Sequence, residues 1–260
     1  MAGPHRRSEA RLTSALAPET GPGHRVDLSS FSRAGVAVIF GASGGIGGAL
    51  VETLRSSRHF EHVLGFSRKS APAIDLLDET SLERASSLAA RAGELRLVID
   101  ATGFLHDNRQ KPEKSLRQID PDNLARSFAL NAIGPALIMK HVLPLAPRSG
   151  KFVFATLSAR VGSIGDNRLG GWYAYRASKA ALNQLVRTAA IELSRRSPEA
   201  ICVALHPGTV ATGLSQPFTS VGRDVHTPDQ ASRHLLEVAQ RLSQDANGGF
   251  FDWRGEPVPW

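Results

Sequence analysis

The chain of 260 residues contains a single cysteine, Cys202, so it cannot form an internal disulfide bond. Cys202 lies in the apolar run 201–205, where we expect a packed core thiol. No apolar stretch approaches the roughly 20 residues that span a bilayer, which argues against a membrane protein. Together, the lone thiol and the missing apolar stretch favour a protein of the reducing cytoplasm.

Clusters of metal-ligating residues and of basic residues are also missing. The nine histidines are dispersed, and no His, Cys and acidic residues have the spacing of metal ligands. The formal net charge is +7, but the 31 basic residues are scattered and form no block with interleaved aromatic residues. We therefore predict no metal site and no nucleic-acid partner.

The first part of the chain shows little hydrophobic periodicity and several breaker residues, Pro4, Pro18, Gly21, Pro22 and Gly23. We interpret residues 1–33 as a flexible N-terminal extension. Arg6-Arg7 is compatible with an export signal, but no apolar segment follows it, and an organelle-targeting peptide is a further alternative. Residues 34–260 contain no linker and are long enough to form one α/β domain.

A buried strand, a glycine-rich turn and a helix are predicted at the start of this domain. The run 36–40 is continuously apolar, Gly41-Ala-Ser-Gly-Gly-Ile-Gly47 follows it directly, and 48–54 has a helical pattern. Glycines let main-chain N–H groups and a helix N-terminus approach a pyrophosphate. The alternative is a merely tight strand-to-helix turn. The residues predicted to bind a dinucleotide here are Gly41, Ser43, Gly45, Ile46 and Gly47.

The end of the next predicted strand, 62–66, bears on which dinucleotide binds. In dinucleotide folds an acidic residue at this strand end holds the ribose 2′-hydroxyl, whereas an arginine accommodates a 2′-phosphate. Ser67, Arg68 and Lys69 stand here, which favours NADP(H) over NAD(H), although a solvated loop charge gives the same pattern. A short strand is predicted at 73–75, with Asp75 placed for the adenine edge.

Strands and helices alternate through the rest of the domain. We predict helices at about 80–92, 121–145, 172–195 and 228–242, and further strands at 95–99, 151–156, 201–205 and 249–252. This order predicts an α/β fold, a Rossmann-type doubly wound parallel sheet of about seven strands with helices on both faces.

Two helices carry polar residues that need an explanation. Pro135 should kink the helix 121–145. Within that helix Asn131 must satisfy a backbone group or hold a water on a relay to Lys179, because an unpaired buried amide costs about 1–3 kcal/mol.

Tyr175 and Lys179 are four residues apart, so both emerge from one helix face. The ammonium should lower the pKa of the phenol and make it a proton donor or acceptor, although an ordinary surface pair has the same spacing.

Several motifs in this order resemble the short-chain dehydrogenase/reductase (SDR) family, and the resemblance covers nearly everything after residue 34. Gly41, Gly45 and Gly47 fit the family's glycine motif, and Asp100-Ala-Thr-Gly103 stands where its Asn-Asn-Ala-Gly usually stands. The stretch 162–179 resembles the branch of C-factor (C-signal) proteins and sniffer-type carbonyl reductases. Residues 108–116 and 252–260 are similar to that branch as well.

The resemblance implies the roles of the site residues. The catalytic residues would be Asn131, Ser158, Tyr175 and Lys179. The cofactor would also contact Ala101, Gly103, Tyr175, Lys179, Pro207, Gly208 and Val210.

The implied reaction is hydride transfer between nicotinamide C4 and a carbonyl or carbinol carbon. Ser158 would hydrogen-bond the substrate oxygen, and Tyr175 would deliver or remove its proton. Lys179 would lower the Tyr175 pKa and bind the nicotinamide ribose, with Asn131 ordering a proton relay.

The interval between Ser158 and Tyr175 is longer than is usual in the family, so Ser163 and Thr156 compete for the serine role. We favour Ser158 because it directly follows a predicted strand. Tyr173 should point off the Lys179 face, and it either lines the substrate cleft or packs.

The substrate lid is predicted at about 209–226, where Leu214, Phe218 and Val221 suggest a partly apolar small-molecule ligand. The family resemblance implies a homodimer or homotetramer through the helices that hold Asn131 and Tyr175. A second hypothesis is a nucleotide-bound, C-factor-like signalling or regulatory protein with little or no turnover.

Overall fold

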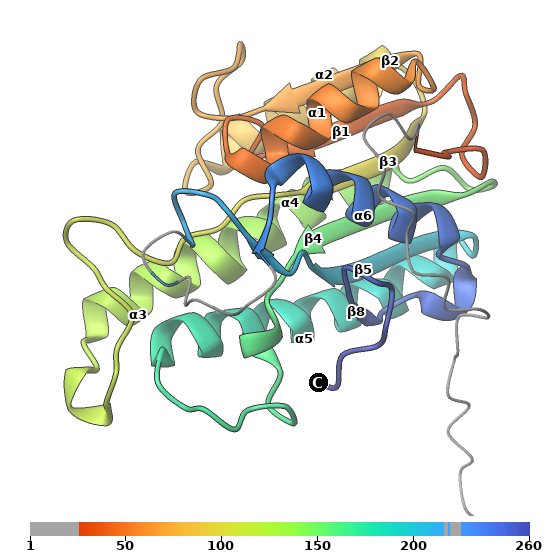
Figure 1. Cartoon of the computed structure of the whole chain (residues 1–260). Helices are drawn as coiled ribbons and strands as arrows, with labels where there is room; N and C mark the ends of the chain where they lie inside the picture. Colours follow the sequence, from red (N-terminus) through yellow and green to blue (C-terminus); the bar gives the residue numbers. More distant parts are fainter. Residues whose placement is uncertain (1–25, 216–217, 219–224) are drawn as a thin grey trace, which may run out of the picture.

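The computed structural model describes residues 26–215, 218 and 225–260 of the chain (Figure 1). Its strands are β1 (Val36–Phe40), β2 (His62–Phe66), β3 (Leu95–Asp100), β4 (Phe152–Leu157), β5 (Ala200–His206), β6 (Thr209–Val210), β7 (Val225–His226) and β8 (Phe250–Asp252). Its α-helices are α1 (Gly45–Ser57), α2 (Glu79–Ala92), α3 (Pro121–Phe128), α4 (Gly134–Val142), α5 (Tyr173–Arg196) and α6 (Pro228–Arg241). Shorter turns are η1 (Leu116–Gln118), the π-helical η2 (Ala129–Ile133), η3 (Leu143–Leu145), η4 (Arg160–Gly162) and η6 (Gln244–Ala246).

A parallel sheet of six strands forms the centre, in the order β2-β1-β3-β4-β5-β8, and β6 pairs with β7 separately. The predicted doubly wound α/β fold is therefore confirmed. The strand predicted at 73–75 is wrong. Side chains and a loop carbonyl pair its main chain instead: Ile74 N donates to Ser67 O, and Asp75 N donates to Ser81 Oγ.

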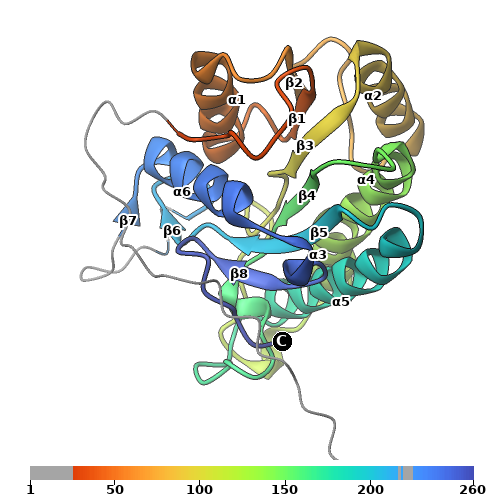
Figure 2. The same cartoon turned by 90° about the vertical axis from the view of Figure 1, so that its right-hand side faces the viewer.

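Alternating residues of each central strand face two apolar layers. On one face Val38 and Phe40 of β1 join a core with Leu82 of α2 and Leu182 of α5. On the other face Ala37 and Ile39 join a core with residues of α1 and α6, including Leu50 and Leu235. Figure 2 shows the two helix layers on opposite sides of the sheet. Burial on both faces explains why these strands are continuously apolar in sequence.

The predicted helix 121–145 runs through α3, η2 and α4 without an interruption of the chain's helical path. Pro135 lacks an N–H to donate to Asn131 O, four residues earlier. The helix widens by a π turn at this place, where Gly134 N–H donates to Ala129 O, five residues earlier. The structure thus has a π turn beside Pro135, and π turns are a common place for a helix to bend.

The same helix corrects the expectation that nothing in the chain is long and apolar enough to span a membrane. Pro121–Leu145 has 25 residues and a mean hydropathy of 1.4, so by length and composition it could cross a membrane. In the fold, 44 % of its most apolar stretch is buried. The core helix of a water-soluble protein passes the same test. We read it as a core helix because α3 packs on α5 and α4 packs on α2.

The N-terminal boundary also differs from the prediction. Residues 1–25 lie outside the described part of the chain, but 26–33 belong to the domain. Val26, Leu28 and Phe31 are buried in the core, so the predicted extension 1–33 ends too late. Cys202 is buried in β5, as expected of a core thiol.

The strand order changes direction between β1 and β3: the chain runs from β1 outward to β2, and then returns to the other side of β1 for β3, β4 and β5. Phe40 is in register with Asp100, and Asp100 with Thr156, so the carboxyl ends of these strands share one edge. A crevice forms outside this edge in open α/β sheets, because the crossovers on its two sides turn in opposite directions. Five of the residues predicted to be functional directly follow the last residue of a strand: Gly41, Ser67, Ala101, Ser158 and Pro207.

Candidate active site

The glycine turn lies tightly against the ends of β2 and β3. Gly41 has a positive φ of 82°, and a Cβ there would lie 2.8 Å from Ala101 O. A Cβ on Gly47 would lie 2.2 Å from Gly41 O. Gly41 N and Ala42 N both donate to Phe66 O, at 2.8 and 3.0 Å. Main-chain contact therefore requires glycine at 41 and 47 and fixes the path of the turn.

Helix α1 begins at this turn with an unsatisfied end. Its N-cap is Gly44, no side chain caps it, and its first turn contains no acidic residue. Ser43, Gly44 and Gly45 are exposed. Free N–H groups at an exposed helix N-terminus bind anions, so a dinucleotide pyrophosphate fits here.

The end of β2 adds exposed positive charge. Ser67 is buried and its Oγ accepts from Lys69 N at 3.1 Å, which turns the chain outward. Arg68 and Lys69 are exposed, and neither forms a salt bridge with any carboxylate in the described residues. Asp75 lies beyond this loop, with Oδ1 accepting from Leu77 N at 2.9 Å. Their role at the adenosine end of a dinucleotide stays a prediction.

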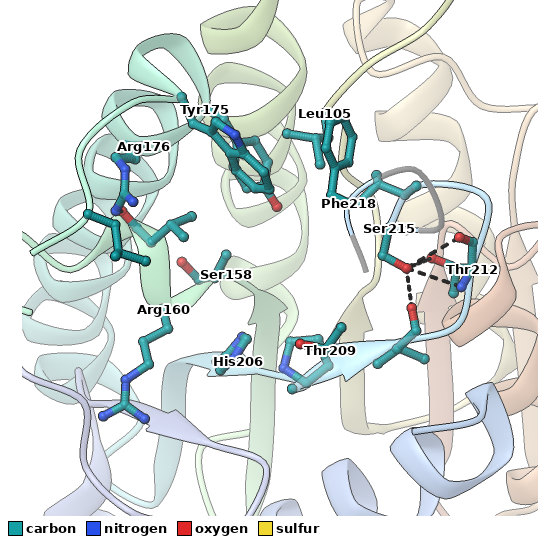
Figure 3. A pocket seen from close by; sticks show the side chains of 18 of the residues that line it. Leu105, Ser158, Arg160, Tyr175, Arg176, His206, Thr209, Thr212, Ser215 and Phe218 are labelled. Carbon is teal, nitrogen blue, oxygen red and sulfur yellow. Dashed lines mark hydrogen bonds between the residues drawn. The ribbon is translucent and has the colours of Figure 1, made fainter. Parts of the chain in front are cut away.

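A cavity of about 590 Å³ opens beside the carboxyl ends of β4 and β5 (Figure 3). Ile46 of the glycine turn lines it, so the cavity and the turn are continuous. Its apolar wall consists of Leu105, Val161, Leu169, Trp172, Val210, Leu214 and Phe218. Its polar lining includes Ser158, Tyr175, Arg176, His206 and Thr209. The lid predicted at 209–226 falls partly outside the described residues, Val221 included, but Leu214 and Phe218 do face the cavity.

Tyr175 and Lys179 lie one turn apart on α5, but their side chains have different environments. The Tyr175 phenol points into the cavity, and burial raises its pKa to about 12. Lys179 Nζ donates to Leu157 O at 2.8 Å, and burial lowers its pKa to about 8. The predicted lowering of the Tyr175 pKa by Lys179 is therefore wrong for this structure, because burial removes the hydration of the phenolate and raises the pKa instead.

The structure distinguishes the three candidates for the catalytic serine by their position relative to the cavity. Ser158 lines the cavity together with Tyr175, whereas Ser163 and Thr156 do not line it. Thr156 Oγ1 donates to Asp100 Oδ2 at 2.7 Å, and Ser163 Oγ accepts from Asp166 N at 3.1 Å. Only Ser158 of the three is thus placed to meet a ligand beside Tyr175.

The side-chain amide of Asn131 forms hydrogen bonds with the main chain, which is one of the two alternatives predicted for it. Its Oδ1 accepts from Phe104 N at 2.7 Å, and its Nδ2 donates to Phe104 O at 2.8 Å. This pair of bonds holds the chain just after Gly103. A Cβ on Gly103 would lie 3.8 Å from both Asn131 Oδ1 and Lys179 Nζ, so the three residues adjoin one another.

Asp100, the departure from the family motif, is fully buried behind the site. It accepts hydrogen bonds from Thr102 N at 3.0 Å, Thr102 Oγ1 at 2.5 Å and Thr156 Oγ1 at 2.7 Å. Burial raises the pKa of Asp100, and these hydrogen bonds oppose that rise. Its carboxyl group also raises the pKa of Lys179, against the larger effect of burial.

The residues predicted to contact the nicotinamide end lie after β5. Pro207, Gly208 and Val210 all line the cavity. Gly208 has a φ of 80°, and a Cβ there would lie 2.8 Å from His226 Cδ2. His206 was not predicted. It lines the cavity, and burial lowers its pKa to about 4, so the imidazole is neutral at neutral pH.

The entry to α5 contains two further residues that the sequence did not reveal. Trp172 caps α5 in a left-handed conformation with φ of 53°, and its ring contacts Tyr175 and Phe218 at centroid distances of 6.1 and 5.1 Å. Glu113, from a distant loop, accepts from Ala174 N through Oε2 at 3.2 Å and from Trp172 N through its main chain. Tyr173 does not line the cavity, so its predicted cleft alternative is not supported.

No three His, Cys, Asp or Glu side chains converge as a metal site anywhere in 26–215, 218 and 225–260. The predicted absence of a metal stays a prediction for the whole chain.

Comparison with known proteins identifies a matching family and similar relatives. The family model described as enoyl-(acyl carrier protein) reductase matches residues 34–240. The C-signal of Myxococcus xanthus is 37 % identical over 146 residues, which are 56 % of this chain and 84 % of that protein. The 1-hydroxy-2-glutathionyl-2-methyl-3-butene dehydrogenase of Rhodococcus sp. (strain AD45) is 33 % identical over 184 residues, 71 % of this chain and 78 % of that protein.

Solved structures share the fold. The NADPH-bound carbonyl reductase from chicken fatty liver has a TM-score of 0.77 at 24 % identity, covering 91 % of this chain and 97 % of that one. The carbonyl reductase Sniffer of D. melanogaster has a TM-score of 0.74 at 22 % identity, covering 87 % of this chain and 100 % of that one. With the family match over 34–240, the chain belongs to the short-chain dehydrogenase/reductase family and is an NAD(P)-dependent oxidoreductase.

Proposed function

We propose that this oxidoreductase is NADP(H)-dependent and interconverts carbonyl compounds and alcohols through Asn131, Ser158, Tyr175 and Lys179. The observation that carries the proposal is the position of Ser158 and Tyr175, which face one cavity that continues into the glycine turn (Figure 3). A hydroxyl group and a phenol beside the same space are groups that can hydrogen-bond a substrate oxygen and transfer its proton.

The dinucleotide would lie along the carboxyl edge of the sheet. The glycine turn and the free end of α1 would hold the pyrophosphate, and Ala101, Gly103, Pro207, Gly208 and Val210 would enclose the remaining parts. Arg68 and Lys69 would receive a 2′-phosphate, because both are exposed without a carboxylate partner among the described residues. The positive charge of Arg68 and Lys69 supports NADP(H) over NAD(H).

The bound nicotinamide supplies or accepts the hydride, and the protein manages the oxygen and its proton. Tyr175, with a pKa near 12, holds its proton at neutral pH and can give it to a substrate oxygen. Ser158 hydrogen-bonds the same oxygen. Lys179 is held by Leu157 O at the floor of the site, and Asn131 holds the chain at Gly103 against it.

The substrate would be a small carbonyl or alcohol compound with an apolar body. Leu105, Trp172, Leu214 and Phe218 form the wall that would receive it. The carbonyl reductases of similar fold and the dehydrogenase relative of Rhodococcus are in keeping with this class.

We also propose a homodimer or homotetramer through the helices that hold Asn131 and Tyr175. Apolar side chains stand exposed on them: Ile133 is 53 % exposed, Leu185 36 % and Ile191 48 %. Light scattering of the purified protein tests this, and a monomeric mass at micromolar concentration would contradict it. The predicted cytoplasmic location stays a prediction.

The decisive experiment follows NADPH oxidation against a panel of aldehydes, ketones and quinones. We expect turnover with at least one of these classes, and none after Tyr175→Phe. The similarity to the Myxococcus xanthus C-signal favours a second candidate, a nucleotide-bound regulatory protein with little turnover. Tight NADPH binding without oxidation across the whole panel would contradict the reductase and support this second candidate.

A further inference from the structure

The hydroxyl of Ser158 has a buried partner on α5. Ser158 Oγ donates to Asn183 Oδ1 at 2.6 Å, and the two residues are only 4 % and 3 % exposed. Asn183 Nδ2 faces Gly162 O at 3.5 Å. A main-chain carbonyl can only accept, so this contact turns the amide nitrogen to Gly162 and leaves the amide oxygen for Ser158.

Asn183 continues the row of residues formed by Tyr175 and Lys179. The three are spaced by four residues, so they follow one another along a single face of α5. Lys179 binds Leu157 O, and Asn183 binds the side chain of the next residue, Ser158. Consecutive turns of one helix thus hold consecutive residues at the end of β4.

We propose, on the basis of the function proposed above, that Asn183 is a positioning residue that selects the Ser158 rotamer needed to meet the substrate oxygen. A serine side chain that lines a cavity has three staggered rotamers available. The amide of Asn183 favours the one that places Oγ between α5 and the cavity. With its hydrogen on Asn183 Oδ1, Ser158 Oγ keeps its lone pairs free to accept a hydrogen bond from the O–H of a carbinol substrate.

A positioning role differs from a packing role in what it depends on. If Asn183 acts through Ser158, its loss should matter only when the serine hydroxyl is present. If it merely packs α5 against η4, its loss should impair the enzyme equally whatever stands at 158. A double-mutant cycle separates the two.

The test measures kcat and KM for oxidation with NADP⁺ and the alcohol that corresponds to the best carbonyl substrate of the panel, for Asn183→Leu, Ser158→Ala and the double variant. We expect Asn183→Leu to lower kcat/KM about tenfold or more, mainly through kcat, and to have less than about a twofold effect in the Ser158→Ala background. Losses that multiply in the double variant, or an unimpaired Asn183→Leu, would overturn the proposal. Gln184→Ala, at an exposed neighbouring position of α5, is the matched control and should leave both constants unchanged.

Asn183→Asp keeps the inference testable if the leucine variant does not fold. A protonated carboxyl group can donate to Gly162 O and accept from Ser158, as the amide does, whereas a carboxylate cannot donate. We expect near-native kcat at low pH and a fall relative to the wild type as the pH rises. If the ratio of the Asn183→Asp kcat to the wild-type kcat is the same at every pH, the proposal is overturned. A wild-type protein without turnover on any substrate would instead overturn the proposed function.

Discussion

Lys179 Nζ and the main-chain oxygen of Leu157 are joined by a 2.8 Å hydrogen bond that ties α5 to the end of β4. The ammonium is 2 % exposed, so it has lost nearly all of its hydration. Its pKa falls to about 8 from 10.5 as a result of burial, and only the opposing effect of Asp100 moderates the fall. Burial of the charged form of this proposed catalytic lysine therefore lowers the stability of the fold.

Replacing this lysine should stabilise the protein while removing its activity. The difference between a pKa of 10.5 and one of about 8 corresponds to about 3 kcal/mol at neutral pH. Lys179→Met also loses the bond to Leu157, so we expect the free energy of unfolding to rise by about 1–3 kcal/mol at pH 7. Urea denaturation measures the change, and a less stable variant would contradict this account.

The pH dependence of that gain has a definite sign. The folded protein holds the Lys179 proton more weakly than the unfolded chain does, so the cost is complete below about pH 8. Above the unfolded pKa of 10.5 both states are neutral and the cost is gone. The stability difference between Lys179→Met and wild type should therefore shrink between these two values. A constant difference would count against burial of a charge as its cause.

Tyr175→Phe should abolish turnover and leave NADPH affinity nearly intact. The phenol is the proposed proton donor, and loss of such a group costs about 10²–10⁴ in rate. Stopped turnover with unchanged quenching of protein fluorescence by NADPH would agree with this role. Near-wild-type reductase activity would show that the role is misassigned.

Ser158→Ala and Ser163→Ala should have unequal effects. Ser158 faces the cavity, and removal of one donor to a reacting oxygen costs about 10²–10³ in kcat. Ser163 is engaged in the turn with Asp166, so its loss should affect mainly stability. Steady-state kinetics of the two matched variants decides between them. A larger kinetic loss in Ser163→Ala would transfer the role to that residue.

Arg68→Glu should weaken NADPH far more than NADH. An anion in place of the guanidinium repels a 2′-phosphate but not a 2′-hydroxyl, so we expect a loss of about 10–100-fold in NADPH affinity. Arg91→Glu, an equally exposed charge reversal in the last turn of α2, is the control and should change neither affinity. Equal losses for both cofactors would remove the case for NADP(H).

Asp100→Asn should move the alkaline limb of the pH–rate profile. The Asp100 carboxyl raises the pKa of Lys179, so its removal should let the lysine lose its proton at lower pH. We expect kcat/KM for reduction to decline from a lower pH than in the wild type. Profiles that superimpose would mean that Asp100 carries no charge during turnover.

Much of the fold was accessible from the sequence because its signals are local. The apolar run of β1, followed at once by Gly41, could form only a buried strand with a turn of close main-chain contacts. The spacing of Tyr175 and Lys179 likewise fixed their shared helix face. The failed strand at 73–75 shows the limit, since Ile74 N and Asp75 N donate to Ser67 O and Ser81 Oγ there and not to a neighbouring strand.

The parts that could not be predicted depend on contacts between distant segments. Glu113 caps α5 from 61 residues away, and nothing near either residue announces the contact. The direction of the Tyr175 pKa depends on how deeply the phenol is buried, which a spacing of four residues does not reveal. Asn183 was not predicted either, although its four-residue offset from Lys179 places it on the same face of α5.

The uncapped start of α1 has a practical consequence at the bench. With Gly44 in the N-cap position, the helix end is open to whichever anion is most abundant around it. Inorganic phosphate in a buffer would then compete with the pyrophosphate that we propose binds here and weaken the apparent affinity of the dinucleotide. Kinetic constants for this enzyme should therefore be measured in zwitterionic buffers.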